Sequence, residues 1–99
     1  MKENLLQIIN HYGIKSQQRK LQEEVFELQE AIINAENNRL IGISRKPSEL
    51  AIEHIAEEIA DCYVMLNQFQ LYYGIENKQI EETMKFKIDR QLERINKEN

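Results

Sequence analysis

The chain has 99 residues, of which 30% are charged, and its formal net charge is −4. This length leaves room for a single domain, residues 1–99, and the acidic balance argues against nucleic acid or an anionic membrane as the main partner, because both select for clustered Lys and Arg. Cys62 is the only cysteine, which excludes an internal disulfide. With neither a leader-like segment nor a long apolar run, the sequence favours a soluble, cytoplasmic protein.

Three glycines and one proline leave little turn chemistry, so a few long helices are favoured over many strands. The first predicted helix is short and amphipathic, and it ends at Gly13 because glycine tolerates the positive φ of a helix C-terminus. Residues 38–46 lose the helical period and are expected to form a loop. Before that loop, from about residue 15 to about residue 37, a second helix is predicted by apolar residues at the helical period: Leu21, Val25, Leu28 and Ile32.

Two more helices follow the loop. Pro47 suits the first turn of a third helix, which is predicted from about residue 48 to about residue 73. Asn77 is the predicted N-cap of a fourth helix that continues to about residue 97. The sequence therefore predicts an all-α fold, in which a short N-terminal helix and three longer helices form an antiparallel helical bundle that is completed by oligomerisation.

The same acidic pattern occurs twice, as EEVFE at residues 23–27 and as EEIAD at residues 57–61. Each occurrence alone is weak, because Glu is common on solvated helix faces. At about 100° per residue, the second and last acids of each pattern lie on one stripe of their helix. In both helices this acidic stripe is displaced from the apolar stripe by the same angle and in the same direction around the helix. In an antiparallel hairpin the numbers of opposite residues sum to about 85, so the two stripes also match in height. We therefore expect four carboxylates to converge: Glu24, Glu27, Glu58 and Asp61.

Four converging carboxylates repel one another unless a cation holds them, so we predict that these four residues form a metal site. An all-oxygen ligand set suits hard cations, which indicates Mg²⁺, with Mn²⁺ as a substitute. Glu23 and Glu57 each precede a predicted ligand, and each supports the ligands, binds another ion, activates water or simply faces solvent. We favour Glu23 as a further catalytic residue. The alternative to a metal site is that the acidic residues of both patterns form a solvated or salt-bridged helix face.

The carboxylate stripe of the second helix continues to Gln17 and Lys20, and the same register places Gln68 opposite Gln17 and Met65 opposite Lys20. The polar members, Gln17, Lys20 and Gln68, are predicted to bind the base or sugar of a nucleotide; otherwise they are ordinary boundary residues. At the other end of the stripe, His54 is predicted to be a hydrogen-bonding neighbour of the carboxylates and not a ligand.

The fourth helix carries a basic stripe at spacings of three and four, formed by Lys87, Arg90 and Arg94. We predict that Lys87 and Arg90 contact substrate phosphates whose charge a metal does not cover alone. The alternative is an ordinary helix surface of Glu and Lys pairs. Tyr12 and Tyr72 are candidates for stacking on a base.

The two acidic patterns resemble the EExxE and ExxD motifs of the MazG-like all-α nucleoside triphosphate pyrophosphohydrolases. The similarity extends to HYG at residues 11–13, to Gln17 and to KIDRQ at residues 87–91, and so it covers nearly the whole chain. It implies Mg²⁺-dependent hydrolysis of a (deoxy)nucleoside triphosphate between the α and β phosphates, yielding a monophosphate and pyrophosphate, with the metal on the four carboxylates. A role in clean-up of the nucleotide pool is implied as well.

The same family contains phosphoribosyl-ATP pyrophosphohydrolases and dimeric dUTPases, so the resemblance leaves the substrate open. One position departs from the family pattern: several relatives have Asn where this chain has Asp89. This departure weakens the transfer of substrate contacts from the fourth helix.

Some apolar side chains lie off the main stripes, at Phe26, Ile33 and Val64. We expect them to form the interface of a homodimer or homotetramer. In such an assembly, the fourth helix, or Arg45 and Lys46 of the loop, would complete the site of a neighbouring subunit. The competing hypotheses are a non-catalytic helical oligomer that binds nucleotides, and a plain coiled-coil partner protein.

Overall fold

The computed structural model describes residues 1–40 and 47–98, and these residues form four helices and no strand. None of these helices is both long and apolar enough to span a membrane. The predicted all-α fold, with a short N-terminal helix and three longer ones, is confirmed. The four helices are α1 (Lys2–Tyr12), α2 (Ile14–Leu40), α3 (Glu49–Tyr72) and α4 (Asn77–Glu98).

Local signals place most helix ends close to their predicted positions. α1 ends at Gly13, whose φ of 90° is readily adopted only by glycine. Ser48 caps α3, because its side-chain oxygen accepts a hydrogen bond from the backbone N–H of Ala51 at 3.1 Å. Pro47 therefore precedes the cap and does not lie in the first turn of α3.

The predicted N-cap of α4 is one residue off. The backbone N–H groups of Gln79 and Ile80 donate to the carbonyl oxygen of Glu76, so Glu76 holds the cap position and Asn77 is the first helical residue. The side chain of Asn77 instead accepts a hydrogen bond from Gln70 at 2.6 Å. This bond ties the start of α4 to the end of α3.

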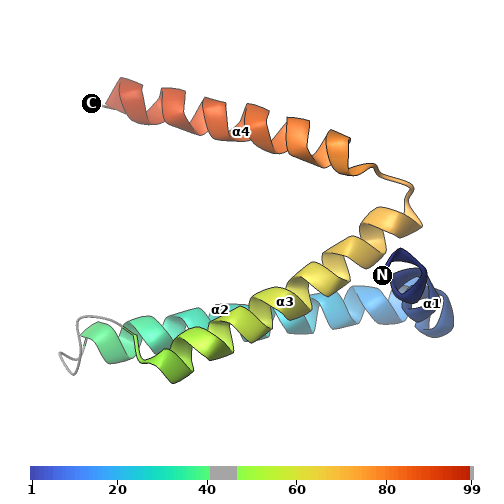
Figure 1. Cartoon of the computed structure of the whole chain (residues 1–99). Coiled ribbons are helices and arrows are strands. Elements are labelled where there is room, and N and C mark those ends of the chain that lie inside the picture. Colours follow the sequence, from blue (N-terminus) through green and yellow to red (C-terminus); the bar gives the residue numbers. More distant parts are fainter. Residues whose placement is uncertain (41–46, 99) are drawn as a thin grey trace.

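α2 and α3 run antiparallel and side by side, and α1 packs across both helices at the end of the hairpin far from their connection (Figure 1). The antiparallel pairing follows from the short connection, which leaves no room for a crossover. Ile9 anchors α1, since it is the most deeply buried apolar side chain of this helix. The core therefore lies between α2 and α3 and beneath α1.

The face of α2 that packs against α3 is not the predicted apolar stripe. Val25 and Ile32, two members of that stripe, are 49% and 44% exposed. The packed face is rotated from the prediction by about 50° around the helix, toward Glu24. Its residues are spaced four and three apart, as in a coiled-coil seam: Gln17, Leu21, Glu24, Leu28, Ala31 and Ala35. Small alanines near the connection allow the two helices to approach closely.

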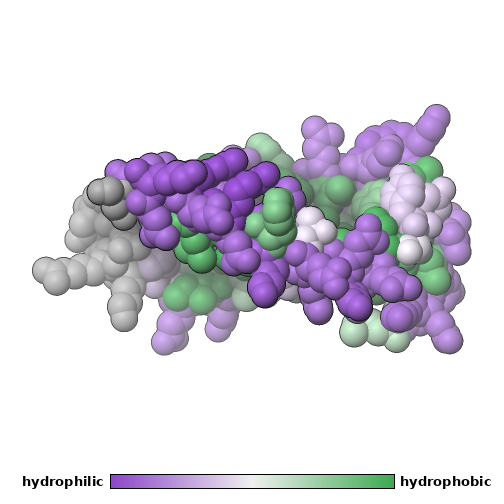
Figure 2. All heavy atoms as spheres, turned by 90° about the horizontal axis from the view of Figure 1, so that it is seen from above, coloured by the Kyte–Doolittle hydropathy of each residue, from purple (hydrophilic) through white to green (hydrophobic). Residues whose placement is uncertain are grey.

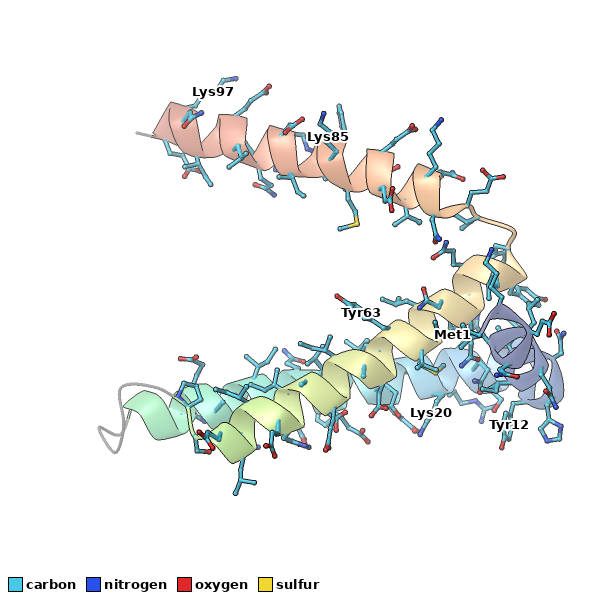
Figure 3. All side chains as sticks on the ribbon, in the orientation of Figure 1. Met1, Tyr12, Lys20, Tyr63, Lys85 and Lys97 are labelled. Atoms are coloured by element: carbon cyan, nitrogen blue, oxygen red, sulfur yellow. The ribbon has the colours of Figure 1, made fainter. Side chains whose placement is uncertain are left out.

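α4 diverges from the hairpin and, within the described residues, packs against none of the other helices (Figure 1). The face of the molecule on the side of α4 is mostly hydrophilic (Figure 2), and Lys85 and Lys97 point away from the hairpin (Figure 3). The radius of gyration is 17.3 Å, compared with about 13 Å for a compact domain of this length. The apolar stripe of α4 is 40–55% exposed: Ile80, Met84, Ile88, Leu92 and Ile95.

Candidate metal centre

Three carboxylates from two helices meet in the middle of the hairpin. Glu24 and Glu27 come from α2 and Glu58 comes from α3, and each offers an oxygen that lies within 4.8 Å of the other two. The predicted convergence of acids across the antiparallel hairpin is thus confirmed for these three residues. Their donor set consists of oxygen alone, which is what hard divalent cations prefer.

Two of the three carboxylates are buried, a feature that the sequence did not predict. Glu24 is 6% exposed and Glu58 is 8% exposed, because both lie in the seam between α2 and α3 and not beside it. The Oε2 atom of each side chain is shielded from solvent and has no hydrogen-bond partner among the residues that the structure describes. A buried carboxylate oxygen without a partner is costly, so these two atoms mark a position that a cation would stabilise.

Asp61 and Glu23 lie next to this cluster. Asp61, the predicted fourth ligand, is not part of the three-carboxylate group; it lines the adjoining cavity together with Glu24. Glu23, the additional predicted catalytic residue, is exposed on the wall of the same cavity. Glu57 is exposed and does not line it.

Two cationic or ionisable groups approach the cluster from within their own helices. The ammonium of Lys20 lies 3.0 Å from Oε1 of Glu24, and this hydrogen-bonded ion pair raises the pKa of Lys20. Nδ1 of His54 lies 3.9 Å from Oε1 of Glu58, too far for a hydrogen bond but close enough for an ion pair when the ring is protonated. His54 therefore lies beside the carboxylates, as predicted, although it does not hydrogen-bond to them.

The crowding of negative charge perturbs two further groups. The charge of Glu24, followed by desolvation and the charge of Glu58, raises the pKa of Glu27, although this side chain is exposed. Burial, followed by the charges of Glu24 and Glu58, raises the pKa of the Cys62 thiol. The free thiol is buried in the seam, where it packs as a small apolar side chain.

We predict that Glu27→Gln raises the melting temperature of the protein in EDTA at neutral pH. Because the pKa of Glu27 is higher in the folded chain than the usual 4.5, the stability from this group is complete below that pH. It is lost as the pH rises through the raised pKa. The gain should therefore disappear in melts recorded below pH 4.5. Glu30→Gln, an exposed change on the same helix, is the control, and an equal gain there would contradict the explanation.

A cavity of about 650 Å³ opens beside the cluster, on the side of the hairpin toward which Tyr12 and Lys20 point in Figure 3. Tyr63 points to the opposite side, toward α4. The wall of the cavity combines cations, acids, amides and apolar groups in a space large enough for a small organic ligand. It is lined by Ile8, Tyr12, Ser16, Gln17, Arg19, Lys20, Glu23, Glu24, Asp61, Val64, Met65 and Gln68.

The predicted opposition of Gln17 and Gln68 is confirmed by a hydrogen bond. Nε2 of Gln17 donates to Oε1 of Gln68 at 2.8 Å, and both side chains are almost completely buried. Nε2 of Gln68 donates to a weak acceptor, the sulfur of Met65, at 3.8 Å. The two amides therefore form a fixed polar element at the wall of the cavity.

The structure adds cavity residues that the sequence pattern missed and separates others from it. Arg19 was not singled out because it lies off the carboxylate stripe, and Ile8 reaches the cavity only because α1 folds back over the hairpin. Tyr12, a predicted stacking residue, does line the cavity. Lys87 and Arg90 lie on α4, which packs against no other described helix, so one chain does not bring them to the cluster.

A comparison of the chain with protein-family models, with curated proteins and with solved structures finds no match.

Proposed function

We propose that this chain is a divalent-metal-dependent pyrophosphohydrolase that converts a (deoxy)nucleoside triphosphate to a monophosphate and pyrophosphate, as its resemblance to MazG-like enzymes implies. One observation carries the proposal: three carboxylates meet across the hairpin, and two of them each bury an oxygen without a partner. A purely structural hairpin gains nothing from such atoms, whereas a bound cation would stabilise both of them. The proposed ion is Mg²⁺, with Mn²⁺ as a substitute.

In this proposal Glu24, Glu27 and Glu58 would hold the ion, with Asp61, which lines the adjoining cavity, as the fourth ligand. A bound divalent ion supplies charge neutralisation at the phosphates and activation of water. Glu23, which is exposed on the same wall, is the residue that we propose to accept the proton of the attacking water.

The wall of the cavity suits the two ends of a nucleotide. Lys20 and Arg19 supply positive charge close to the carboxylates, where a triphosphate would lie. Tyr12 offers an aromatic ring, and the Gln17–Gln68 pair offers amide groups, for a sugar or base. The cavity carries both acidic and basic side chains. It therefore suits a polyphosphate whose charge is neutralised by a bound metal, whereas the acids would repel an anion that binds without one.

The test is the release of pyrophosphate from a panel of canonical and modified (deoxy)nucleoside triphosphates in the presence of Mg²⁺, with dUTP and phosphoribosyl-ATP included to identify those two alternatives. We expect one member of the panel to be hydrolysed to its monophosphate. Calorimetry in parallel identifies the non-catalytic alternative, for which metal-dependent nucleotide binding without any pyrophosphate release would be the signature. A chain that neither binds nor hydrolyses any of them would overturn the proposal.

We further propose that two or more copies of the chain assemble through apolar surfaces on α4 and the hairpin. The chain exposes 8502 Å², whereas a compact folded monomer of 11.8 kDa exposes about 5,900 Å². Two chains that each bury this excess, about 2,600 Å², would bury about 5,200 Å² in total, which is the size of a large obligate homodimer interface. Val25, Ile32, Ile59 and Leu66 lie on the flank of the hairpin opposite the carboxylates, by helical periodicity, and all are exposed. Assembly through this flank leaves the cavity accessible. Of the residues that the sequence predicted for the interface, Phe26 and Ile33 are exposed, whereas Val64 lines the cavity.

A further inference from the structure

Lys20 makes the shortest ion pair among the side chains described in residues 1–37 and 47–98, and it does so with a buried member of the carboxylate cluster. Its side chain is 52% exposed, whereas that of Glu24 is 7% exposed. The lysine stem therefore approaches along the surface, and only the ammonium reaches the cluster. The same side chain lines the cavity that we propose for the nucleotide.

The ammonium compensates the cluster only in part. It lies at Oε1 of Glu24 and leaves Oε2 of that residue, and Oε2 of Glu58, without hydrogen-bond partners. Three carboxylates and one ammonium also leave two negative charges in excess. Lysine is thus an incomplete substitute for a divalent cation at this position, and its long, flexible stem allows it to leave.

We infer that Lys20 is an exchangeable counter-ion: a divalent metal displaces its ammonium from Glu24, and the released ammonium binds the phosphate end of the ligand in the adjoining cavity. This inference rests on the metal site of the proposed function. It assigns Lys20 a positioning role that couples metal loading to phosphate binding, because the same charge serves Glu24 before the metal arrives and the phosphates afterwards.

A purely structural ion pair predicts different behaviour. In that case Lys20 stays on Glu24, and its removal lowers stability without strengthening metal binding. As an exchangeable counter-ion, Lys20 competes with the metal, so its removal strengthens metal binding. It also weakens the binding of a phosphate ligand, because one of the cations of the cavity is gone.

The first experiment measures Mn²⁺ binding to the full chain, without nucleotide, by calorimetry and by electron paramagnetic resonance. We expect Lys20→Met to bind Mn²⁺ about three- to tenfold more tightly than the wild type. Lys78→Met is the matched control, since Lys78 also pairs with a glutamate four residues later, but on α4 and in solvent. Arg19→Met removes a charge from the same cavity without removing the ion pair, so it should change the affinity less than Lys20→Met does.

The second experiment measures the binding of inorganic pyrophosphate at saturating Mn²⁺. Lys20→Met should bind it several-fold more weakly than the wild type, and Lys78→Met should bind it equally well. The inference is overturned if Lys20→Met leaves Mn²⁺ affinity unchanged or lowers it, if Arg19→Met raises it as much, or if pyrophosphate binding does not fall.

Failure of the metal site itself is recognised separately, with Glu58→Gln. If the wild type binds no Mn²⁺, or if Glu58→Gln binds it as the wild type does, the metal site and the inference both fall. If Glu58→Gln loses Mn²⁺ binding while Lys20→Met matches the wild type, the site stands and only the exchange is wrong.

Discussion

Glu58→Gln is expected to lower metal-dependent pyrophosphate release by at least about a hundredfold, a loss typical of removing a group that fixes charge in an active site. Glu58 is the one member of the three-carboxylate group that comes from α3. Without its charge, the ligands of the group come from α2 alone. The amide keeps the size of the side chain and removes a buried charge that has an unpartnered oxygen. The chain should therefore stay folded, as judged by circular dichroism.

Glu53→Gln is the matched control, because Glu53 is an exposed glutamate on the same helix that neither belongs to the cluster nor lines the cavity. Its rate should equal that of the wild type. Equal rates for Glu53→Gln and Glu58→Gln, measured at the same enzyme and Mg²⁺ concentrations, would show that the cluster is not the metal centre of the reaction.

Leu92→Glu is expected to convert a dimer or tetramer to a monomer. Leu92 lies in the apolar stripe of α4 and is 53% exposed in the single chain, and in an assembly it would be buried. A carboxylate without a partner at a buried interface costs several kcal/mol. This cost is a large part of the net free energy of association of many protein complexes. Sedimentation or light scattering at micromolar concentration measures the change as a fall in mass toward 11.8 kDa.

Lys85→Glu on the same helix is the control for that substitution, because Lys85 points away from the hairpin (Figure 3). This variant should assemble as the wild type does. A wild-type chain that is already monomeric at micromolar concentration, or a Leu92→Glu variant that keeps the wild-type mass, would refute assembly through the α4 stripe.

The positions of helix ends were predictable because their signals are local. Gly13 ends α1 and Ser48 caps α3 through contacts within a few residues of the chain, so no distant part of the fold is involved. Asn77 failed as a predicted cap because its side chain has a partner seven residues earlier, Gln70, which competes with the local role.

The meeting of acids across the hairpin was also predictable, because it depends on only two facts. Helical periodicity puts Glu24 and Glu27 on one side of α2, and a short connection makes α2 and α3 antiparallel in a register that places Glu58 opposite Glu27. The hydrogen bond between Gln17 and Gln68 obeys the same register several turns away. Register and antiparallel order thus follow from the sequence.

The burial of the cluster was not predictable in this way. Val25 and Ile32 are larger than Ala31 and Ala35, and a sequence pattern therefore places them in the core. The packed seam instead passes through Ala31 and Ala35, since small side chains permit close helix packing, and this rotation carries Glu24 from the edge into the seam. A choice between two neighbouring faces depends on the shape of the partner helix, which one helix alone does not encode.

The sequence by itself therefore determined the four helices, and it determined that Glu24 and Glu27 lie opposite Glu58. The first result follows from helical periodicity and local helix-end signals, and the second follows from the antiparallel order of two helices joined by a short connection. The tertiary structure decided how deeply these carboxylates are buried, which of their oxygens lack partners among the described residues, and that α1, α2 and α3 together shape a cavity beside them. It also separated α4 from the hairpin. These features depend on how whole faces pack, and packing is a property of several elements at once.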